Sequence, residues 1–122
     1  MLEIPHLYHL ATAAEWDPAA TEPYTVSTLG RSLEDEGFIH LSLARQVAGV
    51  GAAFYGGQDV VLLRVDPAKV RSRVEFEAVL GSDDKYPHLY GPIPREAIVS
   101  ATPVPRGEDG VLDFTGLLPE PI

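Results

Sequence analysis

Apolar and polar side chains alternate over residues 38–42, which read Phe-Ile-His-Leu-Ser. Because successive side chains of a strand point to opposite faces, Ile39 and Leu41 share one face of this segment, and His40 and Ser42 share the other. A polar side chain that is buried without a partner is costly, so the histidine and the serine need polar neighbours or water. The pattern predicts a strand with one face against a core and the other in a cleft.

Alternation and apolar runs also mark the other predicted strands. They lie at residues 7–10, 59–65, 74–80 and 97–101. The run at 59–65 is almost continuous in valine and leucine, which is typical of a central strand covered on both faces. Over 74–80 the alternation predicts that four apolar side chains face the core, while Glu75 and Glu77 share the opposite face. The four apolar residues are Val74, Phe76, Ala78 and Leu80.

Capping residues mark the short helical segments. Thr12 and Glu15 have the spacing of a capping box. Ser32 is placed to cap a second segment, which Gly37 ends in the left-handed conformation. Ser42 is placed to cap a third helix, whose apolar positions follow three- and four-residue spacing.

Length and composition indicate one domain. The 122 residues suffice for a single core. Strands outnumber helices and are joined by short connections, so we expect an α+β domain over residues 1–104. Residues 105–122 are rich in proline, glycine and acids, which predicts an irregular tail that packs on the domain or frays from it.

The formal net charge is −9, which is the wrong sign for holding nucleic-acid backbones. Broad nucleic-acid binding is therefore not expected, whereas a small anionic ligand held by local donors is allowed. The chain has no cysteine, no apolar run of membrane-spanning length and no signal-peptide pattern. We expect a cytoplasmic protein without membrane contact, as a monomer or a small homo-oligomer.

His40 and Ser42 allow two interpretations. Both side chains could face a ligand, with His40 donating to it. Alternatively, Ser42 only caps a helix while His40 satisfies a loop carbonyl. A serine nucleophile is disfavoured, because the glycine-flanked elbow of a hydrolase is missing and residues two apart on a strand point in parallel.

Two further histidines stand among apolar or stiff neighbours: His9 in the first strand, and His88 in a proline-rich loop at 87–91. Taken alone, His9 is typical of a core histidine with satisfied hydrogen bonds. A metal site of these two and His40 is chemically feasible, but the spacings match no metal motif, so we expect no metal.

Glu77 and Tyr90 complete the set of candidates. Val79 follows Glu77 on the same strand face, which indicates a partly buried carboxylate. Such a group suits binding of ribose hydroxyls or stabilisation of a developing positive charge. Tyr90 lies in the same stiff loop as His88, which presents a side chain at little entropic cost, but it could also only fill the end of the sheet.

Two longer motifs carry a family resemblance. Residues 32–42 read Ser-Leu-x-x-Glu-Gly-Phe-Ile-His-x-Ser, and residues 87–92 read Pro-His-Leu-Tyr-Gly-Pro. With a Tyr-His pair near the start and Gln46-Val47 in between, the chain from residue 7 to residue 104 resembles the uncharacterised family known as domain of unknown function 952. Arg45 is a departure, because relatives often have an acidic residue there.

That family resembles the ADP-ribosyltransferase superfamily, which implies a split, strongly bent β-sheet with a cleft that grips NAD. His9 then falls where a first-strand histidine or arginine contacts the nicotinamide-side ribose. The ligand-binding residues that the resemblance implies are His9, His40, Ser42 and Tyr90. Glu77 or His88 is implied as the catalytic group at the anomeric carbon.

Three functions remain open from the sequence. The leading one is an NAD- or ADP-ribose-linked transferase or glycohydrolase that acts at a ribose anomeric carbon, with NAD as co-substrate. The second is a non-catalytic module that binds a nucleotide or metabolite. The third is a metal-dependent hydrolase with a histidine cluster. The leading hypothesis makes a small nucleotide or ADP-ribosyl ligand the expected partner.

Overall fold

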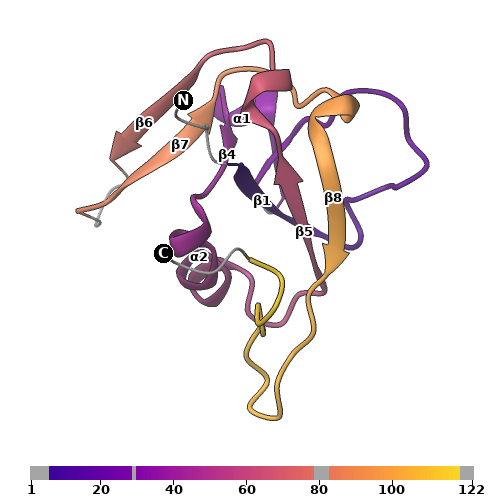
Figure 1. Cartoon of the computed structure of the whole chain (residues 1–122), viewed down its shortest axis with the longest axis vertical. Helices are drawn as coiled ribbons and strands as arrows, with labels where there is room; N and C mark the ends of the chain where they lie inside the picture. Colours follow the sequence, from indigo (N-terminus) through magenta and orange to yellow (C-terminus); the bar gives the residue numbers. More distant parts are fainter. Residues whose placement is uncertain (1–5, 29, 79–82, 119–122) are drawn as a thin grey trace.

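The computed structural model describes residues 6–28, 30–78 and 83–118 of the chain. Within these ranges eight strands form antiparallel sheets of order β1-β5-β8, β2-β3 and β4-β7-β6. The strands are β1 Leu7–Thr12, β2 Val26–Thr28, β3 Arg31–Ser32, β4 Ile39–His40, β5 Val60–Val65, β6 Val74–Ala78, β7 Lys85–Leu89 and β8 Ile98–Pro103. The helices are α1 Leu33–Glu36 and α2 Val47–Phe54, with 3₁₀ turns η1 Ala44–Gln46, η2 Pro67–Lys69 and η3 Arg95–Ala97. Short helices with separate sheets make this an α+β domain (Figure 1).

The segment that begins with β4 links the two larger sheets. Ile39 and His40 pair with β7, whereas Ser42 pairs with Tyr8 of β1 through backbone hydrogen bonds of 2.7 and 2.8 Å. One short stretch of chain therefore belongs to both sheets. In Figure 1, α2 lies beneath this junction. The alternation at 39–42 thus places His40 and Ser42 at the junction of the two sheets.

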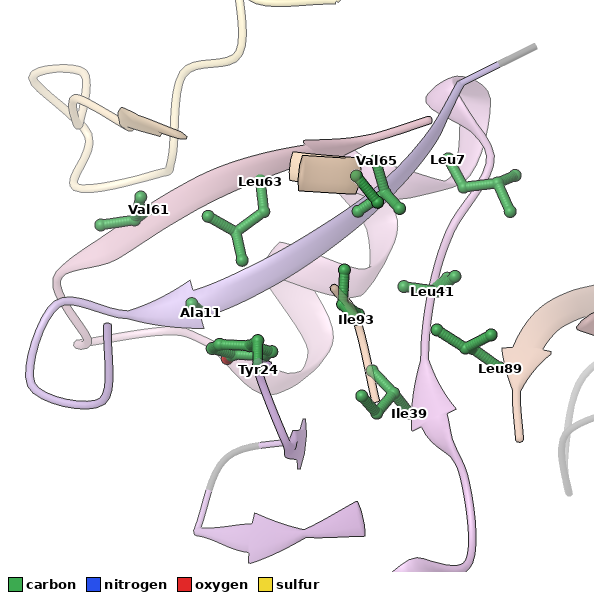
Figure 2. Packing of buried hydrophobic residues seen from close by; sticks show 11 residues of the cluster. Leu7, Ala11, Tyr24, Ile39, Leu41, Val61, Leu63, Val65, Leu89 and Ile93 are labelled. Atoms are coloured by element: carbon green, nitrogen blue, oxygen red, sulfur yellow. The ribbon is translucent and has the colours of Figure 1, made fainter. Parts of the chain in front are cut away.

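Strand β5 is the centre of the core, as the apolar run predicts. It pairs with β1 on one side and β8 on the other, and Leu63 and Val65 are completely buried. These side chains meet residues from β1, β4, β7 and the following loop, as Figure 2 shows. On the other face Leu62 and Tyr8 pack with α2 and with Phe114 from the segment after β8. Both faces of the first sheet are therefore covered.

Local signals around α1 are confirmed. The Ser32 side chain accepts from the Asp35 N–H, and the Asp35 carboxylate accepts from the Ser32 N–H, which completes a capping box. Gly37 ends the helix at φ 86°, a left-handed conformation that glycine adopts without a Cβ penalty. The turn of chain that leads into β4 is therefore fixed by local sequence.

Several other predictions are wrong or fall outside the described residues. Phe76 is 50% exposed and Ala78 is also exposed, because β6 is an edge strand that leans away from the first sheet (Figure 1). Leu80 lies outside the described residues. Only half of the capping box at Thr12 forms: the Thr12 hydroxyl accepts from the Glu15 N–H, while the Glu15 carboxylate accepts from that hydroxyl and not from the Thr12 N–H, and no helix follows. The predicted loop from Pro87 begins as strand β7, so His88 lies on a sheet.

Candidate ligand cavity

A cavity of about 530 Å³ lies where strands β1 and β4 meet helix α2. Its polar lining residues are His9, Thr28, Glu36, His40, Ser42 and Tyr86. From α2 it is lined by Gly49, Val50, Ala53 and Phe54, with Leu10, Leu41 and Tyr55 completing the wall. A largely apolar wall with a few polar groups is typical of small-molecule sites.

His9 is only 2% exposed and is bonded at both ring nitrogens. A carbonyl oxygen can only accept, so Nδ1 carries the proton and donates to the His40 carbonyl at 2.7 Å. The unprotonated Nε2 then accepts from the Tyr24 hydroxyl at 3.0 Å. Burial lowers the pKa of His9 to about 4, so the ring is neutral at pH 7. The His9 ring forms part of the cavity wall, while both of its nitrogens are hydrogen-bonded within the protein.

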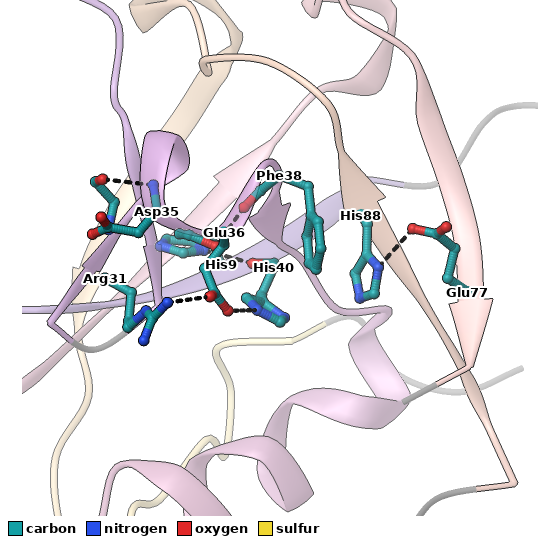
Figure 3. A network of polar contacts seen from close by, with 10 residues as sticks. His9, Arg31, Asp35, Glu36, Phe38, His40, Glu77 and His88 are labelled. Carbon is teal, nitrogen blue, oxygen red and sulfur yellow. Dashed lines mark hydrogen bonds and ion pairs between the residues drawn. The ribbon is translucent and has the colours of Figure 1, made fainter. Parts of the chain in front are cut away.

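Glu36 and His40 form a polar pair in the wall. Glu36 is the last residue of α1 and stands four residues before His40. Its Oε1 lies 3.4 Å from His40 Nε2, and its Oε2 accepts from Arg31 Nη2 at 2.9 Å (Figure 3). Burial lowers the pKa of His40, so this imidazole is neutral at pH 7. Because 3.4 Å exceeds a good hydrogen-bond length, both partners can still take a bond from a ligand.

Ser42 adds a hydroxyl to the wall. The prediction that Ser42 caps the next helix is wrong: Leu43 is the N-cap of η1, and the Gln46 side chain accepts from the Leu43 N–H at 2.9 Å. Pairing with Tyr8 holds the Ser42 backbone in the sheet junction instead. Among the described residues the Ser42 hydroxyl has no hydrogen-bond partner, so it is free to bind a ligand. We call Glu36, His40 and Ser42 the cavity cluster.

A second cluster of Glu77, His88 and Tyr90 lies on β6, β7 and the residue after β7. His88 Nδ1 lies 2.9 Å from Glu77 Oε1, and the Tyr90 hydroxyl donates to the same oxygen. The bonds from Tyr90 and His88 lower the pKa of Glu77, and Glu77 in turn raises the pKa of Tyr90. The Arg73 guanidinium covers the Tyr90 ring at 4.2 Å. None of the three members of this cluster is among the described residues that line the cavity.

Phe38 contacts both clusters, and the rings of His40 and His88 also meet edge-on with centroids 5.2 Å apart. The Phe38 ring stacks on His88 with centroids 4.2 Å apart and meets His40 edge-on at 4.8 Å. His88 is 4% exposed, and its Nε2 is buried with no hydrogen-bond partner among the described residues. Figure 3 shows Phe38 beside the two histidines. His88 is therefore held outside the cavity wall, against the rings of Phe38 and His40.

The structure places three of the six predicted site residues in the cavity wall: His9, His40 and Ser42. The other three form the second cluster: Glu77, His88 and Tyr90.

Sequence analysis missed Glu36, Phe38 and Tyr86. The four-residue spacing of Glu36 and His40 across a helix-ending glycine is a signal that could have identified the first of them. Tyr86 has no such signal, because it reaches the cavity only through the pairing of β7.

The three predicted histidines do not form a metal site in the described ranges. No group of three histidine, aspartate or glutamate side chains there is placed to hold a metal ion. Both nitrogens of His9 are bonded within the protein, and the His88 ring stacks on Phe38. In the same ranges no helix is both long and apolar enough to cross a membrane.

Comparison with known proteins supplies a family and a related structure. The model of a family described as "Protein of unknown function (DUF952)" matches residues 10–101. The X-ray structure of protein CC0527 from Caulobacter crescentus is similar, with a TM-score of 0.76 and 29% identity over 90% of this chain and 95% of that one. The solution NMR structure of CC0527 gives a TM-score of 0.74 and 30% identity over 93% and 96%. No curated protein matches the chain.

Proposed function

The chain belongs to the DUF952 family of proteins of unknown function, and we propose that it binds the ribosyl part of an NAD- or ADP-ribose-type ligand in the cavity and acts at the anomeric carbon. One observation carries this proposal: Glu36, His40 and Ser42 converge on a cavity whose remaining wall is largely apolar. The apolar side suits a planar base. The polar side suits the hydroxyls of a ribose.

The proposed reaction needs a stabiliser of positive charge and a proton acceptor. The bond between C1′ and the base nitrogen breaks, and its electron pair leaves with the base. The Glu36 carboxylate stabilises the oxocarbenium-like charge that develops at C1′. The oxygen of water or of an acceptor hydroxyl bonds to C1′, and His40 takes the released proton, because its neutral imidazole has a free pair at pH 7.

In this proposal Glu36 takes the role that the sequence assigned to Glu77 or His88. Glu36 lines the cavity, whereas Glu77 is bonded to His88 and Tyr90 on a neighbouring part of the sheet. His9 positions His40 through the hydrogen bond to its carbonyl. The second cluster then supports the site through the contacts of His88 with Phe38 and His40.

Isothermal titration with NAD, ADP-ribose and a phosphorylated RNA end tests binding, and chromatography of released nicotinamide tests turnover. We expect heat with at least one of these ligands and nicotinamide release that Glu36→Gln and His40→Gln each reduce about a hundredfold. Glu77→Gln should retain most of the activity. Absence of both heat and release would refute the proposal.

A non-catalytic binding module is the second candidate, and the Arg31–Glu36 ion pair favours it. Arg31 pairs with one oxygen of the carboxylate at 2.9 Å and partly offsets its charge, which weakens its action on a developing cation. Tight ADP-ribose binding with no nicotinamide release, unchanged by His40→Gln, would select this function over the enzyme.

A further inference from the structure

We infer that the cavity selects a nucleoside over its phosphorylated form, with the ring on the face of α2 and the ribose hydroxyls at Glu36. This inference rests on the proposed function and names which part of the ligand enters the cavity. Phosphate groups of a larger ligand would then stay outside.

The face of α2 toward the cavity offers a flat place for a ring. Gly49 and Ala53 are four residues apart, so they share a helix face, and both line the cavity. A Cβ added at Gly49 would meet no atom within 4 Å, so the space above the helix is open there. Val50 and Phe54 flank this floor with larger side chains. A planar base can therefore approach the helix backbone between them.

The Glu36 carboxylate decides which polar group can lie at the other end of the ligand. An ionised carboxylate only accepts hydrogen bonds, so it favours donors such as the vicinal hydroxyls of a ribose. Its Oε1 has only the long 3.4 Å contact with His40, and the neighbouring Ser42 hydroxyl can donate or accept.

A phosphate group is disfavoured at this position. Like the Glu36 carboxylate, it only accepts hydrogen bonds and carries negative charge. Glu36 repels it, and the net charge of −9 adds to the repulsion. The Arg31 guanidinium is already paired with the Glu36 carboxylate. A phosphate that entered would have to compete with Glu36 for that guanidinium. The electrostatics of the wall therefore favour the uncharged ribose.

Two matched pairs of ligands test the selection on the whole chain by isothermal titration: adenosine against adenosine monophosphate, and nicotinamide riboside against its mononucleotide. We expect at least one nucleoside to bind about tenfold more tightly than the corresponding monophosphate. Glu36→Gln should reduce that preference to about threefold or less. Glu34→Gln removes one charge at an exposed position of the same helix, outside the cavity, and should leave the preference unchanged.

A second pair of variants tests where the ring lies. Ala53→Leu fills the floor and should weaken nucleoside binding more than about tenfold. Ala52→Leu adds the same side chain to the neighbouring exposed residue, which does not line the cavity, and should leave binding unchanged. Thermal unfolding of all four variants verifies that each is folded.

The outcomes separate this inference from the proposed function. If phosphates bind as tightly as nucleosides while Ala53→Leu abolishes both, the cavity is the site and the inference is wrong. If Glu36→Gln leaves the preference intact, or Ala53→Leu has no effect, the inference is also wrong. If no nucleoside, nucleotide or NAD binds, the proposed function fails together with it.

Discussion

The cavity cluster and the second cluster each pair a histidine with a glutamate, yet they expose these groups in opposite ways. In the cavity the His40 side chain is 37% exposed and its partner Glu36 is 27% exposed, 3.4 Å away. In the second cluster the His88 side chain is 5% exposed, while Glu77 is 41% exposed and only 2.9 Å away. The imidazole is open in one pair and enclosed in the other.

Exposure and contact length together indicate which pair is available for chemistry. The long contact of Glu36 and His40 can be exchanged for bonds to a ligand at little cost, because the cavity lies beside it. In the short contact of Glu77 and His88, the histidine is buried under a stacked ring, so losing this bond would leave a buried ring nitrogen of His88 without a partner. The first pair suits function and the second suits positioning.

The largest expected effect concerns pH, because His9 behind the cavity cluster is buried in its neutral form. Its pKa is about 4 in the fold against an ordinary 6.5, so between these values the unfolded chain binds a proton that the fold does not. We expect the free energy of unfolding to fall by about 3 kcal/mol as the pH drops from 6.5 to 4. His9→Gln should remove most of this dependence in urea titrations at several pH values. An unchanged slope in the variant would contradict the assignment.

Next in size is the effect of removing the Phe38 ring, which stacks on His88. Phe38→Ala should lower the free energy of unfolding by about 2 kcal/mol, because it uncovers His88 and removes three ring contacts, with His40, His88 and Tyr90. Phe54→Ala is the matched control: Phe54 is 61% exposed on the cavity rim, so about 0.5 kcal/mol or less is expected. Equal losses in urea unfolding would show that the stack has no special role.

Substitution of the two glutamates should affect different properties: stability for Glu77 and nucleoside binding for Glu36. Glu77→Gln is expected to lower the melting temperature more than Glu36→Gln, because Glu77 accepts from both His88 and Tyr90. Glu36→Gln is expected to weaken nucleoside binding about fivefold to tenfold, with no such loss in Glu77→Gln. Calorimetric melting and titration of the two proteins side by side measure both effects. If the same variant is worse in both measurements, the division of roles fails.

The smallest effect is expected for Arg31→Gln. The Arg31 side chain is 55% exposed, and exposed ion pairs contribute about 0.5 kcal/mol or less. Its loss should be barely visible in urea unfolding and should vanish in high salt. A larger, salt-resistant loss would mean that Arg31 holds Glu36 in place rather than only pairing with it.

Much of the local structure follows from neighbouring residues in the chain. The capping box at Ser32, the left-handed Gly37 and the apolar run of β5 need only contacts within a few residues or a uniform apolar pattern, and all three are confirmed. Alternation at 39–42 likewise separates the core face from the cavity face, with Ile39 and Leu41 buried. Alternation fails for Phe76, because it cannot reveal that β6 is an edge strand.

The pattern of residues alone predicts an α+β domain, its central strand and a polar face at His40 and Ser42. The folded structure adds that Tyr86 joins this face, that both His9 nitrogens are bonded and that His88 packs against Phe38 and His40. The physical reason is distance along the chain: β4 meets β7 some fifty residues later, and β1 meets the segment after β4 some thirty residues later. Such pairings depend on how sheets pack, and no local pattern records them.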